Sequence, residues 1–429
     1  MTKNDKYILT AESVTEGHPD KLCDTIADRV LDACLERDPD SRVACEVLAT
    51  AGKILVAGEI TTKTLPDIFH LVCSAVRETG YVSDYEVEIC IHDQSPDITN
   101  AVDGNINTDP EPSTVGLDRS GGARKRCAGD QWEPEQKRTL QRRGAGDQGI
   151  VYGYACRETR EYLPLPVVLA HRITKGLTQA RKTGQIPGLR PDGKAQVSIE
   201  YENGQPQRVA AVVVSCQHEA DVDLESLREA VRNKVLKPAF WDFPMDQGTR
   251  VFLNPGGVFH LGGFEADTGL TGRKLMVDTY GGFAPHGGGA LSGKDGTKVD
   301  RSGAYMARYI AKNIVAARLA EECTVSLAYA IGVEAPVMVQ VDTHGTGKYP
   351  EDVLEKAIGL VFDLSPTGMI MTLGLTEPVF AKFCNYSHFM HRDAPWEQTD
   401  CVELMLEASD LAAAGEPWSI LHHVPLEKG

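Results

Sequence analysis

Gly17–Lys21 (GHPDK) combines a turn, a helix start and three side chains that suit a charged ligand. Pro19 fits the first helical position, because its φ is already set and it has no N–H to lose. A helix N-terminus offers free N–H groups and a positive dipole end, which favour anions. His18 and Lys21 add donors, and Asp20 offers oxygen to magnesium. The segment therefore predicts an anion or metal–phosphate site, with ordinary helix capping and a solvated lysine as the alternative.

A glycine-rich stretch, His286–Gly293, is followed at once by basic and acidic side chains. Its glycines let the backbone approach a ligand closely. Lys294, Lys298 and Arg301, together with Asp300, are the residue types that a metal-bound polyphosphate requires. The stretch predicts a polyphosphate site, and a structural glycine turn is the alternative.

The same stretch formally fits the nucleotide-binding pattern G-x-x-x-x-G-K over Gly288–Lys294. However, Asp295 stands where Ser or Thr would hold magnesium, and Thr279–Pro285 is not a buried strand. A P-loop kinase or ATPase is therefore a rival interpretation, and it predicts phosphate transfer or release of ADP.

Arg273 and Lys274 lie side by side in Leu270–Lys274, shortly after Asp267. A fork-shaped donor beside a point charge suits phosphate, and a solvated surface turn is the alternative. Glu46 and Glu59 are carboxylates within predicted strands. Each is a candidate ligand group or a side chain on the solvent face of a half-buried sheet.

The elements that must position these residues recur along the chain. Hydrophobic periodicity predicts a helix over Asp20–Arg37, a strand over Tyr85–Ile91 and a terminal helix over Glu403–Ala414. Two strands followed by a helix are predicted three times, over Val43–Leu48, Lys53–Ile60 and Pro66–Thr79; over Ala195–Tyr201, Arg208–Gln217 and Asp223–Lys237; and over Thr324–Ile331, Val337–Asp342 and Pro350–Phe362. The repetition predicts an α+β protein of three related units, and coincidence is the alternative.

Thr99–Arg143 shows no hydrophobic period, and it is rich in charge, glycine and proline. Segments this long without regular structure are uncommon inside compact domains. We expect either a functional lid or a solvated insert. The tetrapeptide Ala-Gly-Asp-Gln occurs at 128–131 and again at 145–148, which is compatible with a local duplication.

Composition limits the class of protein. The chain has 429 residues and a formal net charge of −17, which argues against nucleic-acid or anionic-membrane partners. No apolar run has the length of a membrane span, and the first residues lack a secretory-signal pattern. The 11 cysteines include no C-x-x-C pair, as expected of reduced thiols. We therefore expect a cytoplasmic protein without disulfides or a zinc site.

Seven motifs together resemble the methionine adenosyltransferase, or S-adenosylmethionine synthetase, family. They occur in the family's order: Ala11–Lys21, Gly58–Thr62, Gln94–Ile98, Gly144–Gly149, Leu189–Lys194, Gly269–Lys274 and His286–Ser302. The resemblance implies synthesis of S-adenosylmethionine from ATP, L-methionine and water, with release of phosphate and pyrophosphate. It also implies three related domains about a pseudo-threefold axis, in a homodimer or dimer of dimers with active sites between subunits. On this basis we expect an N-terminal domain at 1–98, a long flexible active-site loop at 99–143, a central domain at 144–247 and a C-terminal domain at 248–429.

The resemblance assigns roles to individual residues. Those expected to act on the polyphosphate are His18, Lys194, Arg273, Lys274, Lys294 and Lys298. ATP is expected to contact His18, Asp147, Asp192, Lys194, Phe259, Asp267, Arg273, Lys274, Ala290, Lys294 and Ile331. Methionine is expected to contact Glu59, Gln94, Asp267 and Lys298. Two Mg²⁺ ions per site would involve Asp20 and Asp300, and one K⁺ per subunit would involve Glu46.

The chain departs from the family pattern at four places. The segment at 99–143 is longer than usual, so we expect it to tune product release. Val258 replaces a basic residue before the adenine-stacking Phe259, which removes one nucleotide contact. Leu291 replaces Phe, and Gly296 replaces Pro, which we expect to loosen the glycine-rich stretch. A weakened regulatory subunit and a general nucleotide-binding module are further alternatives, although the latter leaves Glu59 and Gln94 without a role.

Overall fold

The computed structural model describes residues 6–94 and 143–415. These residues fall into two compact units. The first contains 6–94, Tyr154–Asp295 and Thr376–Glu397, and the second contains 143–153, Gly296–Leu375 and 398–415. Most of the predicted Thr99–Arg143 segment, and with it the first Ala-Gly-Asp-Gln copy, lies outside the described residues.

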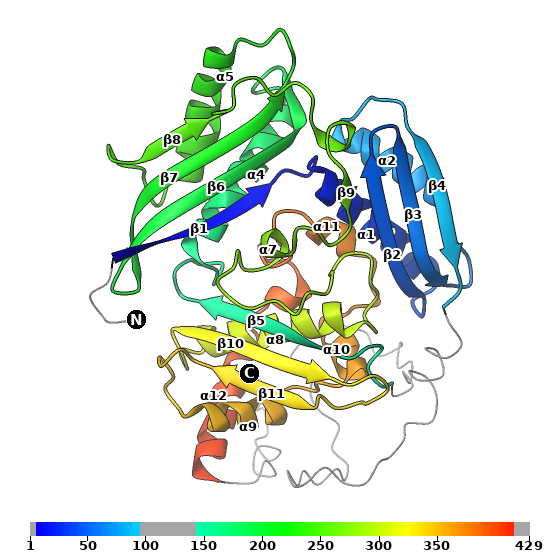
Figure 1. Cartoon of the computed structure of the whole chain (residues 1–429). Helices are drawn as coiled ribbons and strands as arrows, with labels where there is room; N and C mark the ends of the chain where they lie inside the picture. Colours follow the sequence, from blue (N-terminus) through cyan, green and yellow to red (C-terminus); the bar gives the residue numbers. More distant parts are fainter. Residues whose placement is uncertain (1–5, 95–142, 416–429) are drawn as a thin grey trace, which may run out of the picture. The chain divides into compact units, whose positions relative to one another are not determined.

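A helix–strand–strand–helix pattern occurs three times along the chain (Figure 1). The first comprises α1 (Pro19–Arg37), β2 (Arg42–Thr50), β3 (Lys53–Thr61) and α2 (Ile68–Thr79). The second comprises α4 (Leu165–Lys182), β6 (Leu189–Glu202), β7 (Gln205–His218) and α5 (Leu224–Val231). The third comprises α8 (Val299–Ala316), β10 (Glu322–Tyr329), β11 (Met338–Asp342) and α9 (Glu351–Val361). This confirms the predicted α+β class with a threefold strand–strand–helix repeat.

The described strands form three sheets, and each hairpin takes a strand from elsewhere in the chain. The sheet orders are β1-β6-β7-β8, β11-β10-β5 and β4-β3-β2-β9. The added strands are β1 (Lys6–Val14), β4 (Glu86–His92), β5 (Gly149–Cys156), β8 (Arg250–Leu253) and β9 (Gly269–Leu270). Thus β1 pairs with β6 and β9 with β2, so segments distant in sequence share one sheet.

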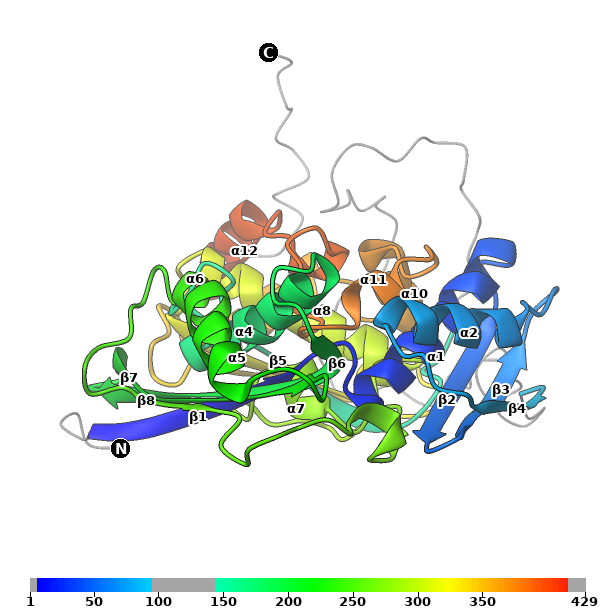
Figure 2. The same ribbon diagram turned by 90° about the horizontal axis from the view of Figure 1, so that it is seen from above.

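Helices pack on one face of the sheets in the first unit (Figure 2). Leu169, Ile173 and Leu177 of α4 are buried in one cluster with Val197 and Val212 of the sheet. Burying such a side chain stabilises the fold by about 1.5–3 kcal/mol. This packing makes the sheet a rigid support for the residues at its strand ends.

Several boundaries differ from those predicted. α2 begins at Ile68 rather than Pro66, because the Asp67 carboxylate caps it by accepting the N–H of His70. The helix predicted over Asp223–Lys237 is interrupted after α5 by a π-helical turn, Arg232–Leu236, ahead of the short α6 (Lys237–Ala239). The strand predicted to end at Ile331 ends at Tyr329. α12 (Val402–Ala414) confirms the predicted terminal helix.

α4 and α8 were not among the helices predicted from the sequence. In α8 the residues of the polar side are buried as well, and even Arg301 and Arg308 are 0% exposed, so this side does not face solvent. The remaining short helices are α7 (Leu275–Asp278), α10 (Pro366–Leu373), α11 (Phe380–Phe383) and two 3₁₀ turns at Gly263–Glu265 and Pro395–Glu397. Among the described residues, no helix is long and apolar enough to cross a membrane.

Candidate active site

The start of α1 has the predicted geometry. His18 is the N-cap residue, with φ −61° and ψ 137°, and Pro19 opens the helix. Nδ1 of His18 accepts the N–H of Asp20 at 3.2 Å. This bond satisfies one free donor of the first turn and anchors the imidazole at the positive end of the helix dipole.

The imidazole of His18 is neutral at physiological pH. Burial lowers its pKa to about 4, and the positive charges of Lys274 and Lys194 contribute to this shift. Because Nδ1 accepts an amide hydrogen, the ring proton must lie on Nε2. His18 is therefore arranged to donate one hydrogen bond from Nε2.

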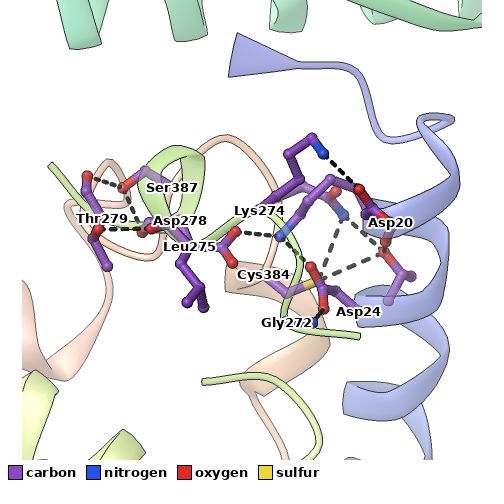
Figure 3. Close-up of polar contacts among 12 residues, drawn as sticks. Asp20, Asp24, Gly272, Lys274, Leu275, Asp278, Thr279, Cys384 and Ser387 are labelled. Atoms are coloured by element: carbon purple, nitrogen blue, oxygen red, sulfur yellow. Dashed lines mark hydrogen bonds and ion pairs between the residues drawn. The ribbon is translucent and has the colours of Figure 1, made fainter. Parts of the chain in front are cut away.

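Asp20 connects the start of α1 with the Leu270–Lys274 segment (Figure 3). Its side chain is 3% exposed, and Oδ2 lies 2.6 Å from Nζ of Lys274. Oδ1 accepts the N–H of Leu270 at 2.9 Å, and Nη1 of Arg273 lies 3.9 Å away from it. The structure thus places a carboxylate and two cations, predicted from two separate motifs, at one helix terminus.

Two further aspartates of α1, which were not predicted from the sequence, bind the backbone of the Leu270–Lys274 segment and of the glycine-rich stretch. Oδ1 of Asp24 accepts the N–H of Gly272 at 2.9 Å. Oδ1 of Asp28 accepts the N–H of Gly293 at 2.8 Å. Both are fully buried. Together with Asp20 they are spaced four residues apart on α1, so one face of the helix carries all three carboxylates. The four-residue spacing of these aspartates was the feature of the sequence from which they could have been predicted as site residues.

Strand β2 holds the same two loops from the other side. The N–H of Thr271 donates to the carbonyl of Val47 at 3.0 Å. The N–H of Cys45 donates to the carbonyl of Gly293 at 2.8 Å, and Lys294 forms a bridge with Ala44. The two predicted phosphate-binding loops are therefore both bound between α1 and β2.

The loops also approach each other closely. Gly272 has φ +75°, and a Cβ added there would lie 2.5 Å from Cβ of Ala290. A side chain is excluded by both the backbone conformation and the neighbouring residue. Ala290, a predicted ATP contact, is thereby placed directly against the Arg273 segment.

The geometry is not that of a P-loop. Lys294 bridges to β2 and the Asp295 carboxylate accepts the N–H of Val43 at 2.7 Å, whereas a P-loop lysine lies at the start of a helix. Helix α8 begins only at Val299, with Lys298 as its N-cap residue. The formal match over Gly288–Lys294 is therefore coincidental.

Two of the residues predicted to contact adenosine, Asp192 and Phe259, lie near the open end of the β6–β7 hairpin, where β6 begins and β7 ends. Oδ2 of Asp192 accepts the N–H of Gly263 at 2.8 Å, and burial raises the pKa of Asp192 to about 6. The N–H of Phe259 donates to Nε2 of His218 at 3.2 Å. These bonds fix the backbone at the half-buried Phe259 and the side chain of Asp192.

The remaining predicted residues of the first unit lie on its strands or within two residues of them. Lys194 on β6 pairs with Glu12 at 2.6 Å, and Asp267 accepts the N–H of Thr268 at 2.9 Å. Glu59 on β3 lies 3.5 Å from Nε2 of His92. The N–H of Gln94, just after β4, donates to Thr61 at 3.1 Å, and Glu46 is exposed on β2.

Four predicted residues belong to the second unit, namely Asp147, Lys298, Asp300 and Ile331. The N–H of Gly332 donates to the carbonyl of Ala145 at 2.9 Å, which places the Asp147 turn beside Ile331. Gly146 packs against Thr297, the residue before Lys298, and Asp300 lies in the first turn of α8. The second unit therefore brings these four residues into one region.

The departures from the family pattern have different structural settings. Gly296 is buried, and a Cβ there would lie 2.9 Å from both Ile370 and Leu375. The surrounding side chains leave no room for a larger residue at this position, and the expected loosening of the stretch stays a prediction. Leu291 is 1% exposed and fits the core, whereas Val258 is 66% exposed.

The carboxylates suit magnesium that arrives with a polyphosphate. The described residues contain no cluster of three or more His, Cys, Asp or Glu side chains that would hold a metal ion alone. Mg²⁺ in phosphate-binding enzymes commonly takes one or two carboxylates and completes its shell with phosphate and water. Oδ2 of Asp20 already faces the Lys274 ammonium, so this position favours a cation.

A separate cavity of about 340 Å³ in the first unit contains none of the predicted site residues. It is lined by Glu16, Thr25, Arg29, Glu78, Thr79, Lys175, Lys182, Ala381, Lys382, Asn385, Tyr386 and His391. Its cations Arg29 and Lys182 are paired with Glu78 and Glu16. We assign the chemistry instead to the two loops bound between α1 and β2, namely Leu270–Lys274 and His286–Lys294. Charged side chains meet a helix N-terminus there, and close packing leaves no room for a side chain at Gly272.

Comparisons with known proteins show the family of the chain. Family models of the S-adenosylmethionine synthetase N-terminal, central and C-terminal domains match residues 6–104, 142–259 and 261–398. A relative from Treponema denticola, named S-adenosylmethionine synthase, is 47% identical over 415 residues, which cover 95% of this chain and 99% of the relative. The chain therefore belongs to the S-adenosylmethionine synthetase family.

Proposed function

We propose that the site assembled at the start of α1 carries out methionine adenosyltransferase chemistry with the residues predicted for it. The methionine sulfur attacks C5′ of ATP, triphosphate leaves, and the triphosphate is then hydrolysed to phosphate and pyrophosphate. The observation that carries this assignment is the meeting of His18, Asp20, Arg273 and Lys274 at one helix N-terminus. A thioether has no proton to lose, so alignment and stabilisation of the leaving polyanion dominate.

The neutral His18 is suited to the departing oxygen. Its Nε2–H would donate to the oxygen that leaves C5′, while Nδ1 remains bound to the helix. Arg273 and Lys274 would exchange their contacts with Asp20 for phosphate oxygens, and Arg273 would orient the hydrolytic step. The remaining cations proposed for the polyphosphate are Lys194, Lys294 and Lys298.

The substrate contacts follow the family resemblance. Adenosine would lie among Asp147, Asp192, Phe259, Ala290 and Ile331, with Phe259 stacking on adenine. Methionine would contact Glu59, Gln94 and Lys298, and Asp267 would serve both its ammonium group and the ribose. The bonds that hold Asp192 and Phe259 around the Gly263 turn support the adenosine part.

The proposed cations are two Mg²⁺ per site and one K⁺ per subunit. Asp20 and Asp300 would each hold magnesium, and Glu46 would hold potassium. Bound magnesium would neutralise part of the polyphosphate charge. Asp20 would exchange Lys274 for that ion, while its Oδ1 stays bound to Leu270.

We also propose that the chain acts as a homodimer or dimer of dimers in the cytoplasm, with ATP and L-methionine as its small-molecule partners. The family resemblance supports this self-association. Neither nucleic acid nor a membrane is proposed as a partner.

The domain division proposed from the sequence is 1–98, 144–247 and 248–429, with 99–143 as an active-site loop. The three helix–strand–strand–helix patterns, one within each of the three longer ranges, support it.

Mass spectrometry of a reaction with ATP, methionine, magnesium and potassium tests the function. We expect a product at the mass of S-adenosylmethionine, with matching amounts of phosphate and pyrophosphate. The variant Lys356→Ala, at an exposed ion pair on α9, serves as a matched control with full activity. ADP in place of the sulfonium product would support the kinase interpretation. No sulfonium product from folded protein would support the regulatory-subunit interpretation.

A further inference from the structure

Lys21 is a buried cation held between two carboxylates. Its side chain is 1% exposed, and Nζ lies 3.0 Å from Oδ2 of Asp24 and 2.5 Å from Oδ1 of Asp278. Two carboxylates at these distances favour the ammonium form of Lys21. Lys21 is therefore charged inside the protein, where an unpaired charge would be strongly destabilising.

Asp24 and Asp278, the two partners of Lys21, fix the two ends of one short segment, Gly272–Asp278. Asp24 uses its other oxygen, Oδ1, to accept the N–H of Gly272 at 2.9 Å. Asp278 is the last residue of α7, and its N–H donates to the carbonyl of Lys274 at 2.8 Å (Figure 3). Lys21 thus connects α1 to both ends of Gly272–Asp278, the segment that carries Arg273 and Lys274.

The segment has little freedom to move once these contacts are made. The carbonyl of Asp278 accepts hydrogen bonds from Ser387 Oγ and from the N–H of His388, both at 3.0 Å. At the other end, Gly272 packs against Ala290 with no room for a Cβ. A change in the Lys21 contacts would therefore be transmitted to the backbone between these two ends, where the two cations lie.

We infer that Lys21 is a positioning residue for the polyphosphate chemistry. It holds Asp24 and Asp278, and through them the backbone of Gly272–Asp278, so that Arg273 and Lys274 face the start of α1. This inference rests on the polyphosphate role proposed for Arg273 and Lys274. Lys21 itself is 1% exposed, so its role is assigned through Asp24 and Asp278 and not through contact with substrate.

Two variants separate positioning from simple stabilisation. Lys21→Met keeps most of the side-chain volume but leaves two carboxylates without their cation. Lys21→Met/Asp278→Asn removes one charge of each sign, so the cluster keeps the formal charge of the wild type. Arg29→Met is the matched control, because Arg29 is also on α1 but pairs with the exposed Glu78.

The assays use the full-length enzyme with magnesium and potassium. Inorganic tripolyphosphate is the probe of the second step, and ATP with methionine is the substrate pair of the whole reaction. For both Lys21 variants we expect the KM for tripolyphosphate to rise about tenfold or more, with the KM for methionine within about twofold of the wild type. The double variant should recover most of the thermal stability that the single variant loses, without recovering the KM. Arg29→Met should match the wild type in each assay.

The opposite pattern would overturn the inference. If the charge-matched double variant regains both stability and the wild-type KM for tripolyphosphate, Lys21 only stabilises the fold. Equal losses for tripolyphosphate and methionine would likewise exclude a role specific to the segment. Failure of the proposed function is distinguished separately, because the wild-type enzyme would then make no S-adenosylmethionine.

Discussion

The ammonium nitrogen of Lys274 lies 2.6 Å from Oδ2 of Asp20, across about 250 residues of sequence. The pair joins the N-terminus of α1 to the segment after β9. Its carboxylate is almost fully buried, whereas the lysine is partly exposed. An incoming magnesium polyphosphate would offer each partner a stronger contact, because the metal suits the carboxylate and the phosphate suits the ammonium.

Asp20→Asn tests this exchange. The amide oxygen still accepts the N–H of Leu270, so we expect Tm to change by only a few degrees. Loss of the charge should lower kcat about 100-fold and raise the magnesium concentration for half-maximal rate. Steady-state rates against magnesium measure both effects, with Asp352→Asn, at an exposed ion pair on α9, as the control. An unchanged magnesium dependence would exclude Asp20 as a ligand.

The two ring nitrogens of His18 have different expected functions, and two variants test them separately. His18→Asn retains an acceptor at the position of Nδ1, and Asn is a good N-cap residue. It should keep the stability of α1 but lose the Nε2 donor, lowering kcat by about 10²–10³. His18→Gln places an amide nearer to Nε2 and should lose the cap, at a cost of about 1 kcal/mol in the free energy of unfolding. Similar kinetics for both variants would count against the Nε2 donor.

Lys294→Ala should cut turnover by about 10²–10³ while the fold remains intact. The reason is that the neighbouring Gly293 is held independently of the lysine side chain: its N–H donates to the Asp28 carboxylate, and its carbonyl accepts the N–H of Cys45. Circular dichroism and the rate of S-adenosylmethionine formation are the two measurements. Turnover close to that of the wild type would remove Lys294 from the catalytic set.

Gly272→Ala should destabilise the protein through a clash as well as through backbone strain. Gly204 has nearly the same φ, +76° against +75°, but a Cβ there meets nothing within 4 Å. Gly204→Ala therefore reports the strain alone, about 1 kcal/mol. We expect Gly272→Ala to lose a further 1–3 kcal/mol, roughly the cost of overpacking, in urea denaturation. Equal losses would show that Ala290 moves away freely.

His171 should make the fold sensitive to acid. It is 1% exposed, its Nδ1 shares a 2.8 Å hydrogen bond with Ser13, and burial lowers its pKa to about 3. Because the unfolded state binds the proton at about 6.5, stability is fully present above that pH and is lost as pH falls toward 3. The loss from this group approaches about 5 kcal/mol.

Urea denaturation at a series of pH values checks this effect. His171→Asn keeps a polar atom near Ser13 but does not titrate, so its free energy of unfolding should fall less steeply between pH 6.5 and 4. His70→Asn, at an exposed position on α2, should follow the wild-type curve. Parallel curves for all three proteins would show that another group controls the acid response.

Local sequence determined the parts of this protein that depend on near neighbours. Pro19 and the apolar spacing that follows determined α1, and alternation of side chains determined the hairpins of all three repeats. The seven motifs also determined the family, which the domain matches and the Treponema denticola relative confirm. These features follow from φ preferences, helical and strand periodicity, and residue types in fixed local order.

Tertiary structure decided what depends on groups far apart in the chain. In α8 even Arg301 and Arg308 are fully buried, and this burial depends on the segments that pack around the helix rather than on its own sequence. The spacing of Asp20, Asp24 and Asp28 was visible, but its meaning required the amides of Leu270, Gly272 and Gly293. A buried carboxylate is stable only with a partner, and that partner is supplied by the packing of distant segments.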